Sequence, residues 1–369
     1  MLRAPDDGER REAARAAAER AGVAVVDASS NDYLGLADGS DVSRETGVQE
    51  VPVGAGASRL IHGTRAPHAE LERALADWVG LPSALLFASG YAANVGLLSA
   101  LGVGGSVIVS DRLNHASTID GCRLSRATVE VAPHLDDAAV RAALARHPSA
   151  AARWVVVESC YSMDGDGPDL AALRGICDEH NAGLIVDEAH ALGVFGPAGA
   201  GRCAEAQVVP DVLVGTLGKS VGSQGAFIAS SASLRTLLWN DARSFVFSTA
   251  PSPRLAAATV LHVERARAAD DRRARLRGTI SEFHAALVAR GISVQPGLRG
   301  PIVPILVGDN ARVLAIVRDL ETEGILAQGI RPPTVPPGGA RLRLTVTAAW
   351  PDGAPERVAE AVRRALARS

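Results

Sequence analysis

At 369 residues the chain is longer than one compact domain usually is, so we expect two lobes. Apolar residues make up 47% of it and charged residues 21%, as in an ordinary globular protein. The net charge of −3 gives no reason to expect nucleic acid or an anionic membrane as a partner.

Four widely spaced cysteines include no CxxC pair, so we expect neither a disulfide framework nor a metal site. The start of the chain is charged and has no apolar core of the kind found in signal peptides. No apolar run approaches the roughly 18 residues that a membrane span needs. These features together predict a cytoplasmic protein.

Up to about residue 250, short apolar runs alternate with amphipathic stretches. The pattern predicts helices at 66–79 and 168–181, and strands at 106–111, 154–159, 183–190, 212–216 and 225–230. Strands this apolar are usually covered on both faces, so we expect an α/β domain with a mostly parallel sheet between helices.

After about residue 250 the pattern changes to long helices and fewer strands. Helices are expected at 253–269, 270–290, near 310–323 and at the C-terminus, and strands at 301–307, 325–330 and 341–346. This set predicts a smaller α+β domain with an antiparallel sheet. We therefore expect an N-terminal segment (1–40) that packs with the small domain, a large domain (41–250) and the small domain (251–369).

Polar side chains follow several of the predicted strands of the large domain. Asp111, Glu158, Asp187 and Thr216 each stand at the carboxyl end of one strand. Ligands of open parallel sheets bind beyond these ends, so the four residues indicate one site at this edge.

Lys219 lies in the glycine-rich stretch VGTLGKSVGSQGAF (214–227). The phosphate-loop motif GxxxxGK[ST] fails here, because Leu213 stands where its first glycine is required. A surface lysine in a glycine-rich turn is the simpler alternative. Thr216 and the neighbouring glycines nevertheless favour the close approach of a ligand, and an amine that attacks a cofactor aldehyde needs such constrained surroundings.

The segment VDEAH (186–190) places Asp187 at the end of an apolar strand and His190 three residues later. Asp187 could be a helix N-cap. In pyridoxal-phosphate (PLP) enzymes, however, a carboxylate keeps the pyridine nitrogen protonated, which lets the ring accept electrons. A histidine nearby could donate to the phenolic oxygen of the ring. Asp187, His190 and Lys219 together are a more specific signal than any one of them.

Two weaker signals precede these motifs in the chain. Gly90 and Tyr91 begin a helical pattern, where backbone N–H groups can bind a phosphate, although many helices begin this way. His115, just beyond a strand end, could stack on a cofactor ring, and a solvated loop histidine is the alternative.

From residue 29 to the C-terminus the chain carries a series of motifs in the order and approximate spacing of one family. They are NDYLGL (31–36), GAGASRLIHG (54–63), SGYAAN (89–94), DRLNHAS (111–117), YSMDGD (161–166), VDEAH (186–190), TLGKS (216–220) and RPPTVPPGGARLRLTVTAA (331–349). The chain resembles the α-oxoamine synthases, a group of fold-type I PLP-dependent transferases. The resemblance implies that the protein joins an amino acid to an acyl thioester with loss of CO2.

The resemblance also implies roles for individual residues. Lys219 would carry PLP covalently, Asp187 would pair with the pyridine nitrogen, and His115 would stack on the ring. Further cofactor contacts are implied for Gly90, Tyr91, Ser162, His190, Thr216, Ser248 and Thr249, and substrate contacts for Asn31, Thr334 and Arg343. An exposed strand arginine is the alternative for Arg343.

The segment SFVFSTAPSP (244–253) resembles the part of the family's chain that reaches the phosphate in the neighbouring subunit. Ser248 and Thr249 have hydroxyls suited to a phosphate oxygen, so we expect a homodimer with shared active sites. A helix N-cap before the helix at 253–269 is the alternative.

The stretch RPPTVP (331–336) is most similar to family members that join L-alanine to a pimeloyl thioester, on coenzyme A or an acyl carrier protein, in biotin biosynthesis. Members that use glycine with acetyl- or succinyl-CoA are the alternative. A non-catalytic scaffold is disfavoured because the expected catalytic residues are all present. The N-terminal segment is shorter than in the family, and its substrate-binding arginine could be Arg11, Arg15 or Arg20.

Overall fold

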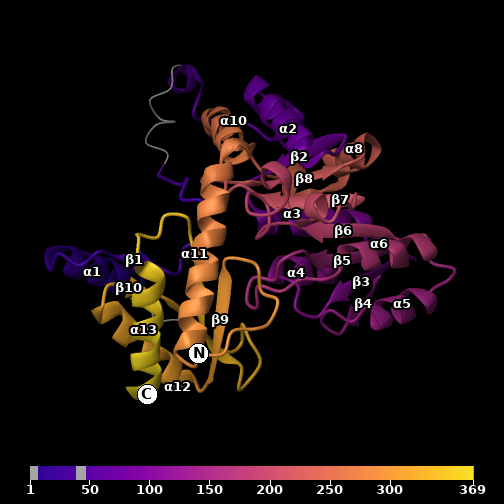
Figure 1. Ribbon diagram of the computed structural model, residues 1–369. Helices are drawn as coiled ribbons and strands as arrows, with labels where there is room; N and C mark the ends of the chain where they lie inside the picture. The colour runs from indigo at the N-terminus through magenta and orange to yellow at the C-terminus, as the bar shows by residue number, and fades with distance from the viewer. Residues whose placement is uncertain (1–6, 39–46, 369) are drawn as a thin grey trace. The chain divides into compact units, whose positions relative to one another are not determined.

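The computed structural model describes the backbone of residues 7–38 and 47–368, and side chains of the first helix from Glu12 onward (Figure 1). The chain forms two compact units. The small unit comprises residues 1–35, 162–165 and 271–369, and the large unit comprises residues 36–161 and 166–270.

The large unit is built on a seven-stranded sheet with the order β2-β8-β7-β6-β5-β3-β4. Its strands are β2 (Ser83–Phe87), β3 (Val107–Asp111), β4 (Thr128–Ala132), β5 (Arg153–Glu158), β6 (Gly183–Asp187), β7 (Val212–Thr216) and β8 (Ala226–Ser230). Every pair from β7 to β4 is parallel, and β8 is antiparallel to both of its neighbours. The predicted mostly parallel sheet is confirmed.

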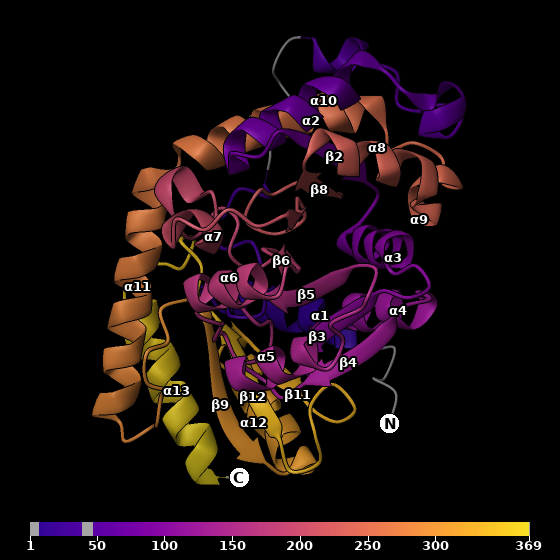
Figure 2. The ribbon, with the colours of Figure 1, turned by 90° about the vertical axis from the view of Figure 1, so that its right-hand side faces the viewer.

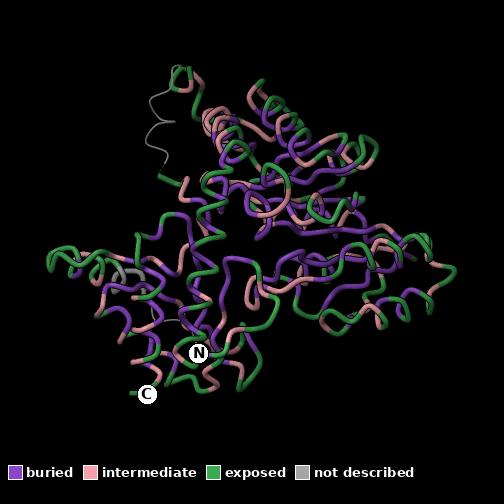
Figure 3. Tube along the Cα trace, in the orientation of Figure 1, coloured by how far each residue is buried: buried purple, intermediate pink, exposed green. Residues whose placement is uncertain are grey.

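Helices cover both faces of this sheet, because alternate residues of its central strands are apolar on both sides. Val156 and Ile185 pack with residues of α3, whereas Val155 and Leu184 pack with residues of α5 and α6. Figure 2 shows α3 and α4 on the opposite side of the sheet from α5 and α6, and Figure 3 shows that the strands are largely buried. The helices and short helical turns of this unit are η2 (Val48–Glu50), η3 (Arg59–Gly63), α2 (Ala66–Val79), α3 (Gly90–Leu101), α4 (Ala116–Leu124), α5 (Asp137–Ala145), α6 (Leu170–Glu179), η4 (Pro197–Gly199), α7 (Arg202–Glu205), α8 (Ala232–Asp241), α9 (Arg243–Val246) and α10 (Pro253–Ala268).

The small unit contains the antiparallel sheet that the sequence predicts, with the order β11-β12-β9. Its elements are α1 (Asp7–Arg20), β1 (Val26–Asp27), α11 (Asp270–Ala289), β9 (Ile302–Gly308), α12 (Asn310–Thr322), β10 (Ile325–Leu326), β11 (Gln328–Ile330), β12 (Ala340–Thr345) and α13 (Ala354–Arg368). The prediction of a single strand at 325–330 is wrong. Its first half is β10, which pairs in parallel with β1, and its second half is β11, which pairs with β12.

The division between the units differs from the expected one at residue 250. It falls after Asp270, because α10 packs through Ala256 and Val260 into the same apolar cluster as Leu71 and Leu75 of α2. The N-terminal 35 residues belong to the small unit. The short segment 162–165 does as well, although it follows a strand of the large unit, and the apolar pattern gave no sign of this.

No helix within residues 7–38 or 47–368 is long and apolar enough to cross a membrane. All four cysteines are buried, and none of them is in a disulfide bond. Burial raises the pKa of the Cys122 thiol to about 11 and that of Cys177 to about 12, so these thiols remain protonated and unreactive near neutral pH.

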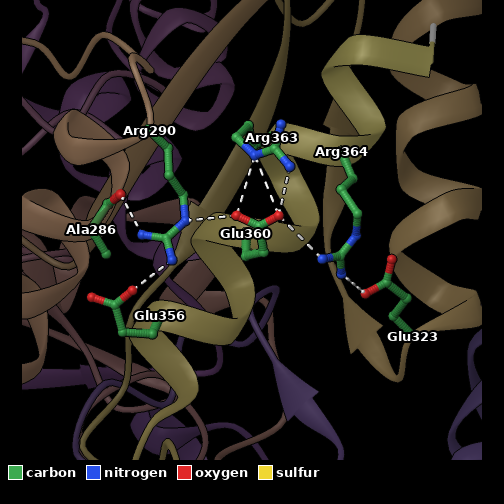
Figure 4. A network of polar contacts seen from close by, with 7 residues as sticks. All are labelled: Ala286, Arg290, Glu323, Glu356, Glu360, Arg363 and Arg364. Atoms are coloured by element: carbon green, nitrogen blue, oxygen red, sulfur yellow. Dashed lines mark hydrogen bonds and ion pairs between the residues drawn. The ribbon is translucent and has the colours of Figure 1, made fainter.

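An ion-pair network joins three helices of the small unit (Figure 4). Glu360 of α13 accepts hydrogen bonds from Arg290, just beyond α11, at 3.0 Å and from Arg363 at 2.7 Å. It also accepts one from Arg364, which reaches on to Glu323 just beyond α12 at 2.6 Å. The arginines, Arg363 first and Arg290 next, lower the pKa of Glu360 to about 2.

We predict that Glu360→Gln lowers the melting temperature at pH 7 by about one or two degrees, since ion pairs of a network that is still partly open to solvent contribute little. The pKa of Glu360 is lower in the folded chain than in the unfolded chain. Its contribution is therefore present above pH 4.5 and is lost as the pH falls toward about 2. Urea unfolding between pH 7 and pH 3 should show the two proteins converging at low pH. Glu356→Gln, which removes one contact with Arg290, is the control and should cost less.

Candidate active site

The carboxyl ends of β3, β5, β6 and β7 meet at one edge of the large sheet, where the loop after β7 carries Lys219. The Lys219 Nζ atom lies 2.7 Å from Nε2 of His190, in the turn that follows β6. His190 is buried and Lys219 is half-buried. The contact holds the amine in one place in a partly desolvated setting, as an amine that attacks a carbonyl group requires.

Asp187, the last residue of β6, is 6% exposed, and both of its carboxylate oxygens accept hydrogen bonds. Oδ1 accepts from the backbone N–H of Ala189 at 2.9 Å, and Oδ2 accepts from the side-chain amide of Asn94 at 2.8 Å. The chain forms turns rather than an α-helix directly after Asp187, so the helix N-cap interpretation is wrong. The carboxylate is instead oriented by two donors from different parts of the sheet edge.

Asn94 connects Asp187 to His115 through a buried serine. Its amide nitrogen also donates to Oγ of Ser117 at 3.0 Å, and that hydroxyl lies 2.8 Å from Nδ1 of His115. The backbone N–H of Ser117 donates to the same Nδ1 at 3.2 Å. A backbone N–H can only donate, so Nδ1 accepts, and the neutral ring carries its proton on Nε2.

The surroundings of His115 also favour the neutral ring. Partial removal from water is the largest cause and lowers the pKa of His115. The negative charge of Asp187 raises this pKa, and the positive charge of Lys219 lowers it further. His115 as a whole residue is exposed, as the loop alternative has it, but its ring is fixed as the N-cap of α4 through Nδ1, and this side of the ring is partly removed from water. Asp187, Lys219 and His115 therefore lie close enough to sense one another electrostatically.

Sequence reasoning did not single out Asn94 or Ser117. Both are polar residues that are almost fully buried, Asn94 on an otherwise apolar face of α3. That apolar context is the signal that could have found Asn94. Glu158 was expected at the site, and its carboxylate accepts the backbone N–H of His115 at 2.5 Å. It thus supports the loop that carries His115.

The start of α3 can bind an anion. Ser89 is the N-cap of α3, and its hydroxyl accepts a hydrogen bond from the N–H of Ala92 at 3.1 Å. Gly90 and Tyr91 are the first two residues of the helix, so their N–H groups are available to a ligand at this end. A side chain at Gly90 would meet no atom within 4 Å, so the space beside it is open. The Tyr91 hydroxyl donates to Asp120 at 2.6 Å, which leaves the backbone rather than the side chain to face a ligand. Thr216 donates to the carbonyl of Gly225 at 3.3 Å.

Arg343 lies in β12 of the small unit and is 2% exposed, so the alternative of an exposed strand arginine is wrong. Its guanidinium donates to the carbonyl of Ser162 at 2.6 Å, to Oγ1 of Thr345 at 3.0 Å and to Oδ1 of Asn31 at 3.1 Å. Within the described ranges no carboxylate pairs with it. A buried guanidinium surrounded by neutral oxygens is suited to binding an anion.

The other residues expected to contact substrate lie at the surface of the small unit. Thr334 is on an exposed turn, where its N–H donates to the carbonyl of Arg331 at 3.1 Å. Of the three N-terminal arginines, Arg15 pairs with Asp27 at 3.4 Å and Arg20 is exposed. The side chain of Arg11 lies outside the described residues.

Ser248 and Thr249 precede α10 but do not cap it. The N-cap is Ser252, whose hydroxyl accepts from the N–H of Leu255 at 3.3 Å. Thr249 is exposed and its backbone pairs with that of Ser58. The N-cap alternative is therefore wrong for both residues.

Residues 23–362 match the family model described as aminotransferase class I and II, and the chain belongs to this family. It is 44% identical over 353 residues to the 8-amino-7-oxononanoate synthase of Marinobacter nauticus, which covers 94% of this chain and 88% of that one. It is 42% identical over 349 residues to the synthase of Geobacter sulfurreducens, with 93% and 89% covered.

Solved structures agree with these sequence relatives. Serine palmitoyltransferase from S. paucimobilis, with bound PLP and myriocin, has a TM-score of 0.87 at 27% identity over 98% of this chain and 97% of that one. The 8-amino-7-oxononanoate synthase of Francisella tularensis has a TM-score of 0.80 at 23% identity over 94% and 98%, which supports the fold alone. The resemblance to the α-oxoamine synthases and the predicted fold type I are confirmed.

Proposed function

We propose that this chain catalyses the PLP-dependent decarboxylative condensation of L-alanine with a pimeloyl thioester, giving 8-amino-7-oxononanoate, CO2 and a free thiol in biotin biosynthesis. The relatives named 8-amino-7-oxononanoate synthase support the reaction. The observation that carries the proposal is the group formed by Lys219, His190 and Asp187 at one sheet edge. We propose a cytoplasmic location, which the four buried cysteines without a disulfide bond support.

The residues at the sheet edge fit PLP by the chemistry of their donors and acceptors. The Asp187 carboxylate suits the pyridine nitrogen, the N–H groups at the start of α3 suit the phosphate, and the Lys219 amine suits the aldehyde. When bound, PLP supplies a protonated ring that stabilises the negative charge left by removal of the Cα proton.

The chain's own residues have distinct tasks in this reaction. Asp187, fixed by Asn94 and Ala189, keeps the proton on the ring nitrogen. His115 offers a neutral ring for stacking, so that no second cation opposes that proton. Lys219 removes the Cα proton of L-alanine and later returns a proton to the product carbon, and the contact with His190 holds its amine between these transfers.

We propose that Arg343 binds the carboxylate of L-alanine. Its planar guanidinium can bind two oxygens at once, and its burial among neutral acceptors favours an anionic ligand. Asn31 fixes one edge of the guanidinium, and Thr334 would contact substrate as in the family. The carboxylate of the substrate leaves as CO2, which drives the condensation forward.

We also propose a homodimer with shared sites, in which Ser248 and Thr249 reach the phosphate held by the partner. Thr249 is exposed and caps no helix of its own chain. Large apolar side chains are exposed in the two segments that pair at Thr249, with Ile61 80% and Phe247 72% exposed. Such a patch favours burial against a second chain.

The proposed reaction predicts that purified protein with PLP forms 8-amino-7-oxononanoate from L-alanine and pimeloyl-CoA or pimeloyl carrier protein, as detected by mass spectrometry. Comparing the two thioesters identifies the acyl carrier. Lys219→Ala is the control and should form no product, since no other residue at the site can both hold the aldehyde and move the proton. Product from glycine with acetyl- or succinyl-CoA, and none from L-alanine, would contradict the assignment.

We expect Asp187→Asn to lower kcat about a thousandfold, roughly 4 kcal/mol of transition-state stabilisation, because the charge that holds the ring proton is lost. The new amide has one acceptor oxygen in place of two, so its NH2 group would face a donor, either the Asn94 amide or the N–H of Ala189, which is a mismatch of two donors. The double variant Asp187→Asn with Asn94→Asp repairs the mismatch but leaves the charge displaced, so it should stay nearly inactive. Near-normal kcat in either variant would refute the role of Asp187.

A shared site predicts complementation between two inactive chains. Lys219→Ala mixed with Thr249→Glu should regain about a quarter of normal activity after exchange of subunits, because half of the dimers are hybrids and each hybrid has one intact site. The doubly substituted chain mixed with the normal chain should give no active hybrid. If light scattering at the assay concentration shows a monomer and that monomer is fully active, the shared site is excluded.

A further inference from the structure

His134 lies just after β4 in the large unit and is not used by the proposed chemistry. Its Nδ1 atom is 2.9 Å from Oδ1 of Asp111, and its Nε2 atom is 3.3 Å from Oδ2 of Asp166. Carboxylates only accept hydrogen bonds, so both ring nitrogens must donate and the ring is an imidazolium. Burial, the largest single contribution, lowers the pKa of His134, but the hydrogen bonds and charges of the two carboxylates together raise it to about 9.

The first carboxylate, Asp111, shapes the turn that leads to His115. It accepts from the N–H of Leu113 at 2.7 Å and from the N–H of Leu135 at 3.0 Å. The carbonyl of Asp111 also accepts from the N–H of Asn114 at 3.2 Å. The backbone between β3 and α4 is thus folded around the Asp111 carboxylate, to which His134 donates a hydrogen bond.

The second carboxylate belongs to Asp166, which directly follows the segment 162–165 in the chain. The N–H of Tyr161 donates to the carbonyl of Asp166 at 2.8 Å, which closes the base of this segment. Oδ1 of Asp166 is buried without a hydrogen-bond partner among the described residues, so His134 is the group that compensates this carboxylate there. The Tyr161 ring packs edge-on against His134 at 4.5 Å.

Within the small unit, the same segment holds two arginines of β12. The carbonyl of Ser162 accepts from Arg343, and Asp164 pairs with Arg341. Within the small unit, Arg343 therefore contacts the segment 162–165, which lies in sequence between Tyr161 and Asp166.

We propose that His134 is a positioning residue that links the turn carrying His115 to the base of the segment carrying Ser162. Through Asp111 it orients the turn of His115, the residue proposed to stack on the cofactor, and through Asp166 it fixes the backbone where the segment 162–165 begins and ends. The part that concerns the binding of L-alanine rests on the proposed function. The link itself rests only on the contacts of His134.

His134→Gln tests the link, because glutamine keeps a polar side chain but cannot donate to both carboxylates as a cation. We expect faster hydrogen exchange in peptides covering 111–115 and 159–166, and about tenfold weaker L-alanine binding to the holoenzyme, measured from its absorbance. The visible circular dichroism of bound PLP should change as well. His147→Gln is the matched control, since it removes a histidine–carboxylate contact of 2.8 Å to Glu130 on the same unit, and it should change none of these.

Asp166→Asn keeps the contact between His134 and Asp111, and guards against simple misfolding of the first variant. It should weaken L-alanine binding and speed exchange at 159–166, while exchange at 111–115 stays normal. Unchanged exchange in both peptides of His134→Gln, or a change confined to 111–115, would overturn the link. Exchange needs neither substrate nor turnover, so this outcome is independent of whether the proposed reaction is correct.

Discussion

The hydrogen bond between Asn94 and Asp187 orders the site of the large unit. A carboxylate that is 6% exposed is costly unless donors satisfy it, and Asp187 receives one donor from its own turn and one from α3. Strand β6 fixes the backbone position of Asp187, and the hydrogen bond from Asn94 of α3 fixes the orientation of its carboxylate. Because the first turn of α3 also presents the N–H groups suited to a phosphate, one helix orients two of the groups that a PLP site requires.

Two histidines near this edge have opposite protonation states, for reasons that lie in their neighbours. His115 accepts from a backbone N–H and has Lys219 close by, and its pKa is lowered mainly by the protein packed around it. His134 stands between two carboxylates that outweigh the effect of burial and raise its pKa. The neutral ring suits stacking, and the charged ring suits a structural link between carboxylates. Residue type alone assigns neither role.

The small unit handles its buried charge differently. Arg343 is almost fully buried and donates to neutral oxygens, so its positive charge remains available to an anion. Arg341, two residues earlier in β12, instead pairs with Asp164. Arg341 and Arg343 face the same side of the strand because they are two residues apart. They differ in their partners on the segment 162–165, since Arg341 pairs with the Asp164 carboxylate and Arg343 donates to the neutral carbonyl of Ser162. That segment therefore belongs to the small unit in space, although in sequence it follows a strand of the large sheet.

The sequence by itself determined the mostly parallel sheet and predicted the motif residues Lys219, His190 and Asp187, because apolar runs and local motifs carry that information along the chain. It did not reveal Asn94 or Ser117 as partners of Asp187 and His115, nor Asp166 as a partner of His134. It also predicted one strand at 325–330, where two short strands join different sheets. Only the tertiary structure decided these points, since hydrogen bonds between residues far apart in sequence depend on strand register and helix packing, which no local pattern encodes.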